Sequence, residues 1–378
     1  MVKKNNLLVA LLGITIAGIG FGLVTPVTVI LLEKNHTQGW ITGLVTMVGY
    51  LAIFFCSGFA GKLYSKYNLK KLLLLGLFLW MLGALGHIFW YNLYILFTVK
   101  LIMGMGGTFV FIGTEVLINY TSTNQNRGKN IGLYASLLSA GIAVGTLLIW
   151  TVKIADYVPF VIGAVIMGIV IVFISFLLED IHLNTKNNSQ EKLPFSKMPK
   201  TGIFSALIYG LFESSIIVVV PLFGLRIGLD QDQVAYVLAS FVIGGIVLLY
   251  LISRLSDKYS KYNIILIVSF FLAILLLVPI ASSNFYVLLI LFFIIGGIVP
   301  SFYTIGLSYT VEYVDSKYIA YSNSFYIMMY GLGTLVGPLW GSLLVDYSLN
   351  VGYWLYSALL CLIFFIYFSI NKAKYQKK

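Results

Sequence analysis

Long apolar runs alternate with short polar loops along the whole chain. A run of about 20 apolar residues is long enough to cross the hydrocarbon core of a bilayer as an α-helix. Twelve such runs can be counted, with predicted bounds of 7–32, 40–60, 72–90, 94–118, 130–152, 157–178, 201–222, 234–253, 264–283, 285–309, 321–345 and 351–370. The pattern predicts an all-α integral membrane protein with twelve transmembrane helices.

Composition strengthens this prediction. Of the 378 residues, 60% are hydrophobic and 10% are charged, so the chain has too few polar residues to coat a water-soluble core of its size. A net charge of +11 would suggest a nucleic-acid partner in a soluble protein. In a membrane protein it is an orientation signal, helped by anionic lipid headgroups. We therefore expect a lipid bilayer as partner and no nucleic acid.

The basic residues concentrate in alternate loops. Of the 24 Lys and Arg residues, all but Lys34, Lys100, Lys153 and Arg226 fall on one predicted side of the membrane. Because Lys and Arg are enriched in cytoplasmic loops, both termini are predicted to be cytoplasmic. The Lys-rich, Arg-poor composition is typical of bacteria, so we expect a multi-pass protein of the bacterial cytoplasmic (plasma) membrane.

Two similar halves, 1–178 and 201–378, lie on either side of a polar stretch at 179–200. A constant offset of 192 residues pairs Gly104 with Gly296, Tyr134 with Tyr326, Gly141 with Gly333, Gly145 with Gly337, and the loop Lys62–Tyr67 with Arg254–Tyr259. The repeat predicts two six-helix bundles related by a pseudo-two-fold axis and joined by a cytoplasmic linker.

Short motifs point to a family. The loop after the second span reads Gly61-Lys62-Leu63-Tyr64-Ser65-Lys66-Tyr67-Asn68-Leu69-Lys70-Lys71, which is similar to G-x-L-x-D-R-x-G-R-K with Ser65 in the acidic position. The fourth span carries Lys100-Leu101-Ile102-Met103-Gly104-Met105-Gly106, similar to R-x-x-x-G-x-G, and it is followed by Glu115 and Asn126-Arg127-Gly128. With these motifs the chain resembles the major facilitator superfamily over nearly its whole length.

The resemblance implies a transporter whose central cavity is lined by the first, fourth, seventh and tenth helices. It also implies gating loops, which here contain Lys62, Ser65, Lys66, Arg127, Arg254, Asp257 and Lys258. In the family, the acidic residue of this loop caps a helix of the opposite half and holds the cytoplasmic side shut. Asp257 is therefore predicted to face the start of the fifth helix, and Asp257→Asn to shift the population toward the inward-facing state. The alternative is a solvated loop charge that only helps to set the orientation.

Polar positions recur on one face of those same four helices. In a membrane such groups should face water or a partner and not lipid. The residues predicted to line the cavity are Thr15, Gly22, Thr25, Thr108, Phe111, Glu115, Ser205, Tyr209, Ser301 and Thr304. The glycines of the fourth, fifth and eleventh helices are interpreted as packing contacts.

Two charged residues, Lys100 and Glu213, fall deep inside predicted spans. A charge there costs several kcal/mol unless it is paired or hydrated, so an isolated Glu213 would tend to keep its proton. We hypothesise that Glu213 is the proton-coupling residue and Lys100 its partner. The alternatives are a static ion pair or a Lys100 side chain that snorkels to the interface. Glu115 lies near the cytoplasmic end, where interfacial solvation also explains it.

These observations predict a secondary active transporter of a small organic molecule that works by alternating access. Proton-coupled efflux of lipophilic or cationic compounds, as in an antiporter, is the favoured function. A proton-coupled importer of a sugar or other metabolite and a lipid-linked substrate flippase are the alternatives. No enzyme is expected, since no nucleophile, base and orienting group cluster at one depth. The three histidines lack metal-site spacing, and we expect no cofactor, a monomer, and a small-molecule substrate and protons as partners.

Overall fold

The structure, a computed structural model, describes residues 2–123, 126–179 and 193–372. Within these residues the regular elements are helices, and no strand is present. Twelve helical segments in the described part of the chain are long and apolar enough to cross a membrane. The prediction of an all-α chain with twelve spans is confirmed.

The chain divides into two compact units. The N-terminal unit comprises residues 1–37 and 44–186, and the C-terminal unit comprises residues 38–43 and 187–378. The boundary falls inside one helix, so the first turn of that helix groups with the C-terminal unit.

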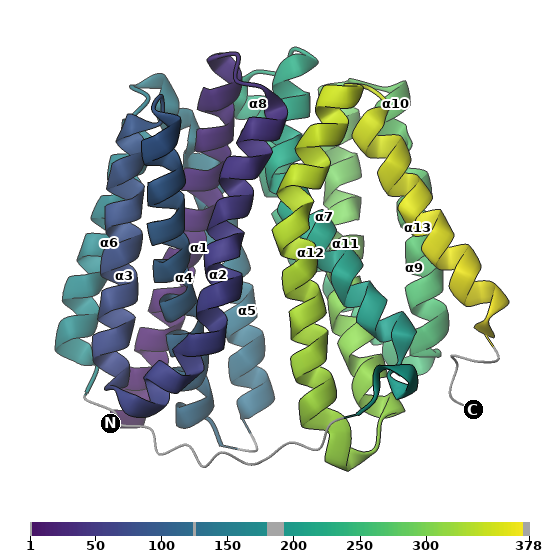
Figure 1. The fold of residues 1–378 in the computed structure, drawn as a ribbon, viewed down its shortest axis with the longest axis horizontal. Coiled ribbons are helices and arrows are strands. Elements are labelled where there is room, and N and C mark those ends of the chain that lie inside the picture. Colours follow the sequence, from purple (N-terminus) through teal and green to yellow (C-terminus); the bar gives the residue numbers. More distant parts are fainter. Residues whose placement is uncertain (1, 124–125, 180–192, 373–378) are drawn as a thin grey trace. The chain divides into compact units, whose positions relative to one another are not determined.

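The N-terminal unit is built from six long helices, which run from purple through blue to teal in Figure 1. They are α1 (Val2–Lys34), α2 (Gly39–Lys66), α3 (Leu69–Gly86), α4 (Leu93–Thr121), α5 (Arg127–Leu147) and α6 (Val158–Leu177), with the short 3₁₀ turns η1 (His87–Phe89) and η2 (Leu148–Lys153). Side-chain caps set two of the starts. Asn68 Oδ1 accepts from Lys70 N at 2.9 Å, and Asn92 Oδ1 accepts from Ile95 N at 3.2 Å, which satisfies amides that have no partner inside the helix.

The C-terminal unit runs from teal to yellow in Figure 1. It contains η3 (Phe195–Lys197), α7 (Lys200–Arg226), α8 (Gln231–Lys258), α9 (Lys261–Leu275), α10 (Val278–Ala281), α11 (Phe285–Tyr313), η4 (Ser316–Tyr318), α12 (Ile319–Tyr347) and α13 (Gly352–Ile370). A capping box formed by Asp230 and Gln233 starts α8. The ninth span is interrupted after Leu275, where α9 ends. The short helix α10 completes the span and has Pro279 at its start, where proline is tolerated.

The predicted span bounds agree with the helices apart from small shifts at the ends. The largest at the C-terminal ends are those of the second and eighth spans, whose helices reach Lys66 and Lys258 instead of 60 and 253. Both extensions carry the helix beyond the purely apolar run, because polar residues near a helix end still fit the helical backbone. The proposed linker at 179–200 falls mostly on residues 180–192, which lie outside the described residues.

Glycine contacts repeat between the two units at the offset of 192. A Cβ on Gly104 of α4 would overlap the carbonyl oxygen of Gly49 on α2, and a Cβ on Gly296 of α11 would overlap that of Phe241 on α8. These two pairs are equivalent under the offset. They let the helix backbones touch, which is the use of small residues at helix crossings.

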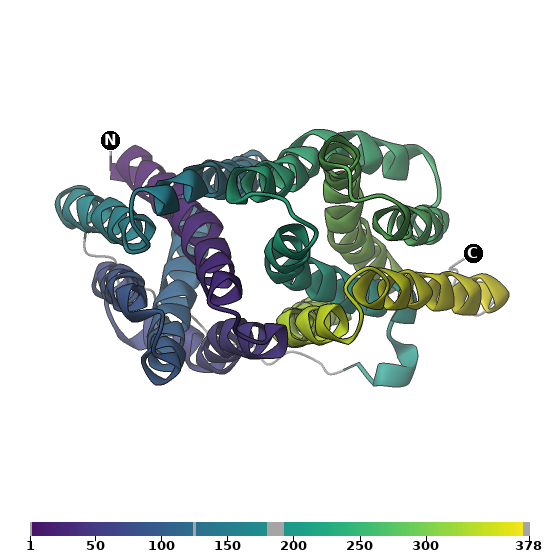
Figure 2. The same ribbon diagram turned by 90° about the horizontal axis from the view of Figure 1, so that it is seen from above.

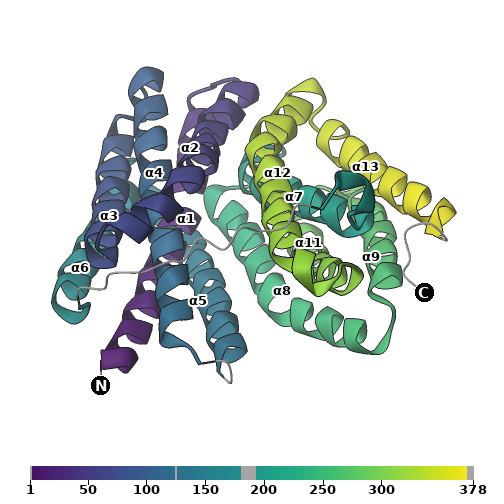
Figure 3. The same ribbon diagram turned by 60° about the horizontal axis from the view of Figure 1, so that its bottom comes forward.

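The same correspondence holds for the helix pairs α1–α5 and α7–α12, which Figures 2 and 3 show from two further directions. A Cβ on Gly141 would overlap the carbonyl oxygen of Thr15, and a Cβ on Gly333 would overlap that of Leu207. A Cβ on Gly145 would likewise overlap the carbonyl oxygen of Ile19, and a Cβ on Gly337 would overlap that of Leu211. The interpretation of these glycines as packing contacts is therefore confirmed, and the repeat read in the sequence is a repeat of backbone contacts.

Candidate functional site

The carboxylate of Glu213 lies in the middle of α7 and binds two tyrosine hydroxyls. Tyr209, one turn earlier on the same helix, donates to Oε1 at 2.7 Å, and Tyr330 on α12 donates to Oε2 at 2.7 Å. All three side chains are half-buried. The expectation that Glu213 is isolated is wrong, because each of its oxygens accepts a hydrogen bond within its own unit.

Stacked rings hold the two hydroxyls in place. The ring centroids of Tyr209, Tyr303 and Tyr330 lie 5.3 Å apart in each of the three pairs, and the rings of Tyr209 and Tyr330 are stacked with an interplanar angle of 19°. Tyr326 packs edge-on against Tyr303 and donates to the Tyr303 carbonyl at 2.7 Å. Such aromatic pairs restrict each ring, so the donors stay directed at the carboxylate.

This arrangement suits a group that alternates between ionised and protonated forms. Hydrogen bonds to an ionised carboxylate are shorter and stronger than neutral ones, and the two phenols stabilise the charge in an otherwise aromatic setting. On protonation one oxygen becomes a donor, and a tyrosine hydroxyl can turn to accept from it. The site therefore has partners for both forms of Glu213.

Lys100 occupies a different setting in the N-terminal unit. Its side chain is 2% exposed, so it does not snorkel to the surface. It lines a cavity of about 20 Å³ together with Phe21 and Thr25 of α1, Thr46, Gly49, Tyr50 and Ile53 of α2, and Met103 and Gly104 of α4. Among the described residues of this unit, no carboxylate stands at ion-pair distance from Lys100. Lys100 and Glu213 belong to different units, and their pairing stays a prediction.

The other predicted cavity residues of the N-terminal unit fall into three groups. Thr25 lines the Lys100 cavity, and Phe111 packs against Phe21 with centroids 5.3 Å apart. Three positions make structural contacts: Thr15 donates to Leu11 O, Thr108 donates to Gly104 O, and Gly22 packs against the backbone of Ile142. The Glu115 side chain is exposed.

Of the described residues that were predicted to line the cavity in the C-terminal unit, Tyr209 alone is a hydrogen-bond partner of Glu213. Ser205 is completely buried and donates to the carbonyls of Gly202 and Phe302 at 2.7 and 3.0 Å. Ser301 donates to Ile298 O, and the exposed Thr304 donates to Pro300 O at 3.4 Å. Their place in a cavity stays a prediction.

Most of the gating-loop predictions fall outside what the structure describes. This holds for the side chains of Lys62, Ser65, Arg127 and Asp257, and so for the Asp257 lock. The other three are exposed: Lys66 lies over the ring of Tyr67, Arg254 lies over the ring of Tyr250, and Lys258 ends α8.

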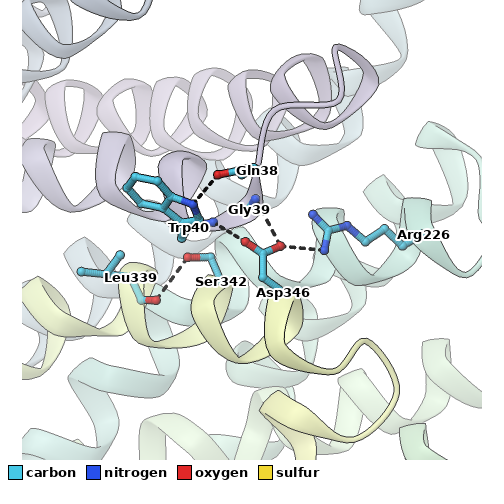
Figure 4. A network of polar contacts seen from close by, with 7 residues as sticks. All are labelled: Gln38, Gly39, Trp40, Arg226, Leu339, Ser342 and Asp346. Atoms are coloured by element: carbon cyan, nitrogen blue, oxygen red, sulfur yellow. Dashed lines mark hydrogen bonds and ion pairs between the residues drawn. The ribbon is translucent and has the colours of Figure 1, made fainter.

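A polar network at the C-terminal end of α12 was not predicted (Figure 4). Asp346 accepts from Trp40 N at 2.7 Å and Gly39 N at 3.2 Å, which caps the first turn of α2, and it pairs with Arg226 Nη1 at 2.8 Å. A Cβ at position 39 would lie 2.5 Å from Asp346 Oδ1, so the close approach requires glycine. All of these residues belong to the C-terminal unit.

A comparison with known families gives the fold a name. The family model described as Major Facilitator Superfamily matches residues 10–207 and 202–378. The chain belongs to the major facilitator superfamily. It is therefore a multi-pass membrane protein of a family of secondary transporters, as its motifs indicated. Among the described residues, no group of three His, Cys, Asp or Glu side chains could hold a metal ion.

Similar proteins agree with this assignment. The chain is 26% identical over 345 residues to the MFS-type transporter YfkF of Bacillus subtilis (strain 168), covering 90% of this chain and 88% of that protein. It is 21% identical over 341 residues to the MFS-type transporter YcaD of Escherichia coli O17:K52:H18, covering 88% and 87%.

Solved structures share the fold. The nucleoside transporter NupG matches with a TM-score of 0.78 at 17% identity over 100% of both chains. The D-xylose-proton symporter matches with a TM-score of 0.78 at 13% identity over 96% of this chain and 97% of that one. At these identities the likeness concerns the fold alone.

Proposed function

We propose that this transporter is coupled to protons and that Glu213 is the group that carries the proton. The observation that supports this is the pair of tyrosine hydroxyls on the two oxygens of a half-buried carboxylate. A carboxylate that only had to bridge two helices would need no partner on its own helix, yet Tyr209 occupies the second oxygen. The donors on both oxygens suit a group that gains and loses its charge during each cycle.

The coupling follows from differential stability. A ligand or proton shifts a conformational equilibrium only as far as its affinity differs between the two states. If Glu213 reaches water from one side in one state and from the other side in the second, a proton taken up from one side is released on the other. Substrate movement in the opposite direction is then driven by the proton gradient.

We propose efflux of a small, lipophilic organic molecule as the direction. The surroundings of Glu213 are tyrosine rings, and no Asn or Gln is among its hydrogen-bond partners in the described structure. An importer of a sugar or other metabolite would need more amide and paired-charge partners for hydroxyl-rich substrates. That importer remains the second candidate, since both the nucleoside transporter and the xylose symporter share the fold. A flippase for lipid-linked substrates is the third.

Vesicle transport tests coupling and direction together. Everted and right-side-out vesicles containing the full chain receive a panel of organic cations, neutral lipophiles, sugars and nucleosides with an imposed pH gradient. Accumulation in everted vesicles that disappears with an uncoupler supports proton-coupled efflux. Accumulation only in right-side-out vesicles establishes import. Transport that ignores the pH gradient in both preparations overturns proton coupling.

Membrane orientation has its own test. We propose that both termini are cytoplasmic and that the protein resides in the cytoplasmic membrane, because of the loop distribution of Lys and Arg. Single cysteines placed near His36 and near Lys197 should react with an impermeant reagent from opposite sides. Equal labelling of both from outside would contradict this orientation.

A further inference from the structure

Tyr326 of α12 joins two helices beside the Glu213 site. Its side chain is completely buried. Its hydroxyl donates to the carbonyl of Tyr303 on α11 at 2.7 Å and lies 3.2 Å from the carbonyl oxygen of Phe302. The Tyr326 ring also packs against the Tyr303 ring, with centroids 5.3 Å apart and an interplanar angle of 64°. Tyr326 therefore contacts both the backbone and the side chain of Tyr303.

A serine of α7 bonds to the same turn of α11. Ser205 is completely buried, and its hydroxyl lies 3.0 Å from Phe302 O and 2.7 Å from Gly202 O of its own helix. Gly306 of α11 leaves room for both hydroxyls, since a Cβ there would lie 2.7 Å from the Tyr326 hydroxyl and would overlap Ser205 Oγ. Hydroxyls from α7 and α12 thus meet on one turn of α11. We call Tyr326, Ser205 and Gly306 the α11 clasp.

The turn held by the α11 clasp carries a ring that touches both donors of Glu213. The Tyr303 ring lies 5.3 Å from the ring of Tyr209 and 5.3 Å from that of Tyr330, and these two tyrosines donate to the carboxylate. Tyr330 also follows Tyr326 by one turn on α12. A shift of α11 along α12 would therefore move the Tyr303 ring against both donors.

The N-terminal unit has an equivalent clasp at the offset of 192. The equivalents of Tyr326, Ser205, Gly306 and Phe302 are Tyr134, Gly13, Thr114 and Val110. Thr114 donates to Val110 O at 2.8 Å, and its hydroxyl lies 3.1 Å from that of Tyr134. The hydroxyl and the glycine have thus changed places between the two units, while the tyrosine is kept.

Only the C-terminal clasp lies beside a carboxylate. In the N-terminal unit Phe21 stands at the position of Glu213, and Phe111, the equivalent of Tyr303, packs against it with centroids 5.3 Å apart. A tyrosine at this position therefore contributes to helix packing in both units. In the C-terminal unit alone it also fixes a ring next to the donors of an ionisable group.

The titratable side chains next to Glu213 come from its own helix and from α12. They are Tyr209 and Tyr330, whose rings contact Tyr303 of α11. The helix α8 also packs against α7. Among the described residues, no side chain of α8 makes a hydrogen bond or ion pair with Glu213. The proton affinity of Glu213 within its unit therefore depends on how firmly these two tyrosines are held.

We propose that Tyr326 is a positioning residue that sets the proton affinity of Glu213. The α11 clasp keeps the Tyr303 ring against the two tyrosines that donate to the carboxylate, so both hydroxyls stay directed at it. Tyr326 acts through these rings, since it is not itself a hydrogen-bond partner of Glu213 in the described structure. This inference rests on the proposed function only in that Glu213 must take up and release a proton.

Infrared spectra of the purified full chain in detergent, recorded across a pH series, test the inference without any transport. A protonated carboxyl group has its own carbonyl absorption band, and the band that is missing in Glu213→Gln belongs to Glu213. The pH midpoint of this band is then compared between the wild type and the variants. Lys100, the predicted partner of Glu213, is unchanged in all of them.

Three variants make the test specific. Tyr326→Phe keeps the ring and removes the hydroxyl, so the ionised carboxylate is less stabilised. The midpoint should rise by about 0.5 to 1 pH unit, which is roughly a three- to tenfold change in proton affinity. Ser205→Ala should raise it by less, because the Ser205 hydroxyl also bonds to its own helix. Tyr134→Phe is the matched control, since it removes the equivalent hydroxyl of the N-terminal unit and should leave the midpoint unchanged.

The inference is overturned if Tyr326→Phe keeps the wild-type midpoint, or if Tyr134→Phe raises it equally. It is also overturned if no titrating band disappears in Glu213→Gln. Should Tyr326→Phe fail to fold, an unchanged midpoint in Ser205→Ala would contradict the role of the clasp. Gradient-driven accumulation that survives Glu213→Gln would instead overturn the proposed function alone, because the infrared titration requires no transport.

Discussion

Lys100 and Glu213 are the two deeply placed charges of a repeated fold, and they are accommodated in opposite ways. Glu213 has a donor on each oxygen and rings packed around both donors. Lys100 stands at a cavity, with no carboxylate beside it among the described residues of its unit. Two hydrogen-bond donors suit a group that must remain in place while it exchanges a proton, whereas Lys100 is buried without such a partner among the described carboxylates of its unit.

The repeat makes this comparison sharper. The position equivalent to Glu213 in the N-terminal unit is Phe21, and the position equivalent to Lys100 in the C-terminal unit is Phe292. Each charge therefore stands where the other unit has a phenylalanine. Each unit therefore accommodates an apolar ring where the other has a charge, and we propose that the two charges serve function.

The largest effect is expected from Glu213→Gln. Glutamine keeps the shape and can still accept from a tyrosine hydroxyl, but it cannot exchange a proton. Gradient-driven accumulation should be lost completely, while substrate exchange without a gradient continues. Both are measured in the same vesicles with labelled substrate. Normal accumulation by this variant would rule out Glu213 as the coupling group.

Lys100 should give the next largest effect. Lys100→Ala removes the charge and enlarges the cavity, and we expect transport to fall about tenfold, the equivalent of roughly 1.4 kcal/mol, with a changed pH dependence. Lys100→Arg keeps the charge and should retain much of the activity. Initial rates measured across a pH series separate the two variants. An Ala variant with the wild-type pH profile would assign Lys100 a purely structural role.

Tyr330→Phe and Tyr209→Phe test the hydroxyl donors of the Glu213 site. Each removes a bond that favours the ionised carboxylate, so protonation becomes easier and the pH midpoint of transport should move upward. A hydrogen bond to a charged group contributes about 1.5 to 3 kcal/mol, which corresponds to roughly one to two pH units. Tyr303→Phe is the matched control, because its hydroxyl is not one of the two donors to Glu213. Equal shifts in all three variants would point to ring packing as the cause.

Asp346→Ala should have the smallest effect on transport. It therefore serves as a reference for the substitutions of Lys100 and Glu213. Its pair with Arg226 is partly exposed, with side-chain exposures of 24% and 22%, and exposed pairs contribute only about 0 to 1 kcal/mol. The loss of the two amide bonds adds a cap effect of about 0.5 to 2 kcal/mol. The free energy of unfolding in denaturant should fall by about 1 kcal/mol, with proton coupling intact. A variant that unfolds on purification would show that this network contributes more than its exposure suggests.

Much of the fold could be predicted from hydropathy and glycine spacing. The spans follow from run length, and the pairing of Gly141 with Gly333 identifies equivalent helix contacts from the sequence alone. Tyr209 was predicted with Glu213 because both lie on one helix, one turn apart. Tyr330 and Asp346 were missed because their partners lie on other helices. The sequence of one helix does not indicate at which depth it meets another helix.

The polar stripes are compatible with two positions of each hydroxyl. Thr108, Ser205 and Ser301 have the spacing of a cavity face, yet each hydroxyl bonds to a carbonyl of its own helix. A hydroxyl three or four residues from a helical carbonyl can always make this bond. The sequence pattern is the same whether the hydroxyl faces a cavity or turns back on its helix, so the two cases separate only in the structure.

The glycine contacts between α7 and α12 have a mechanical consequence. At Gly333 and Gly337 there is no side chain between the two backbones, and a slide of one residue would bring a larger side chain into the place of a hydrogen atom. Close packing of this kind permits two discrete arrangements far more readily than gradual shear. We therefore expect α7 and α12 to move as one rigid body that carries Glu213 and Tyr330 together. Bending during transport should then occur mainly in helices that pack less closely.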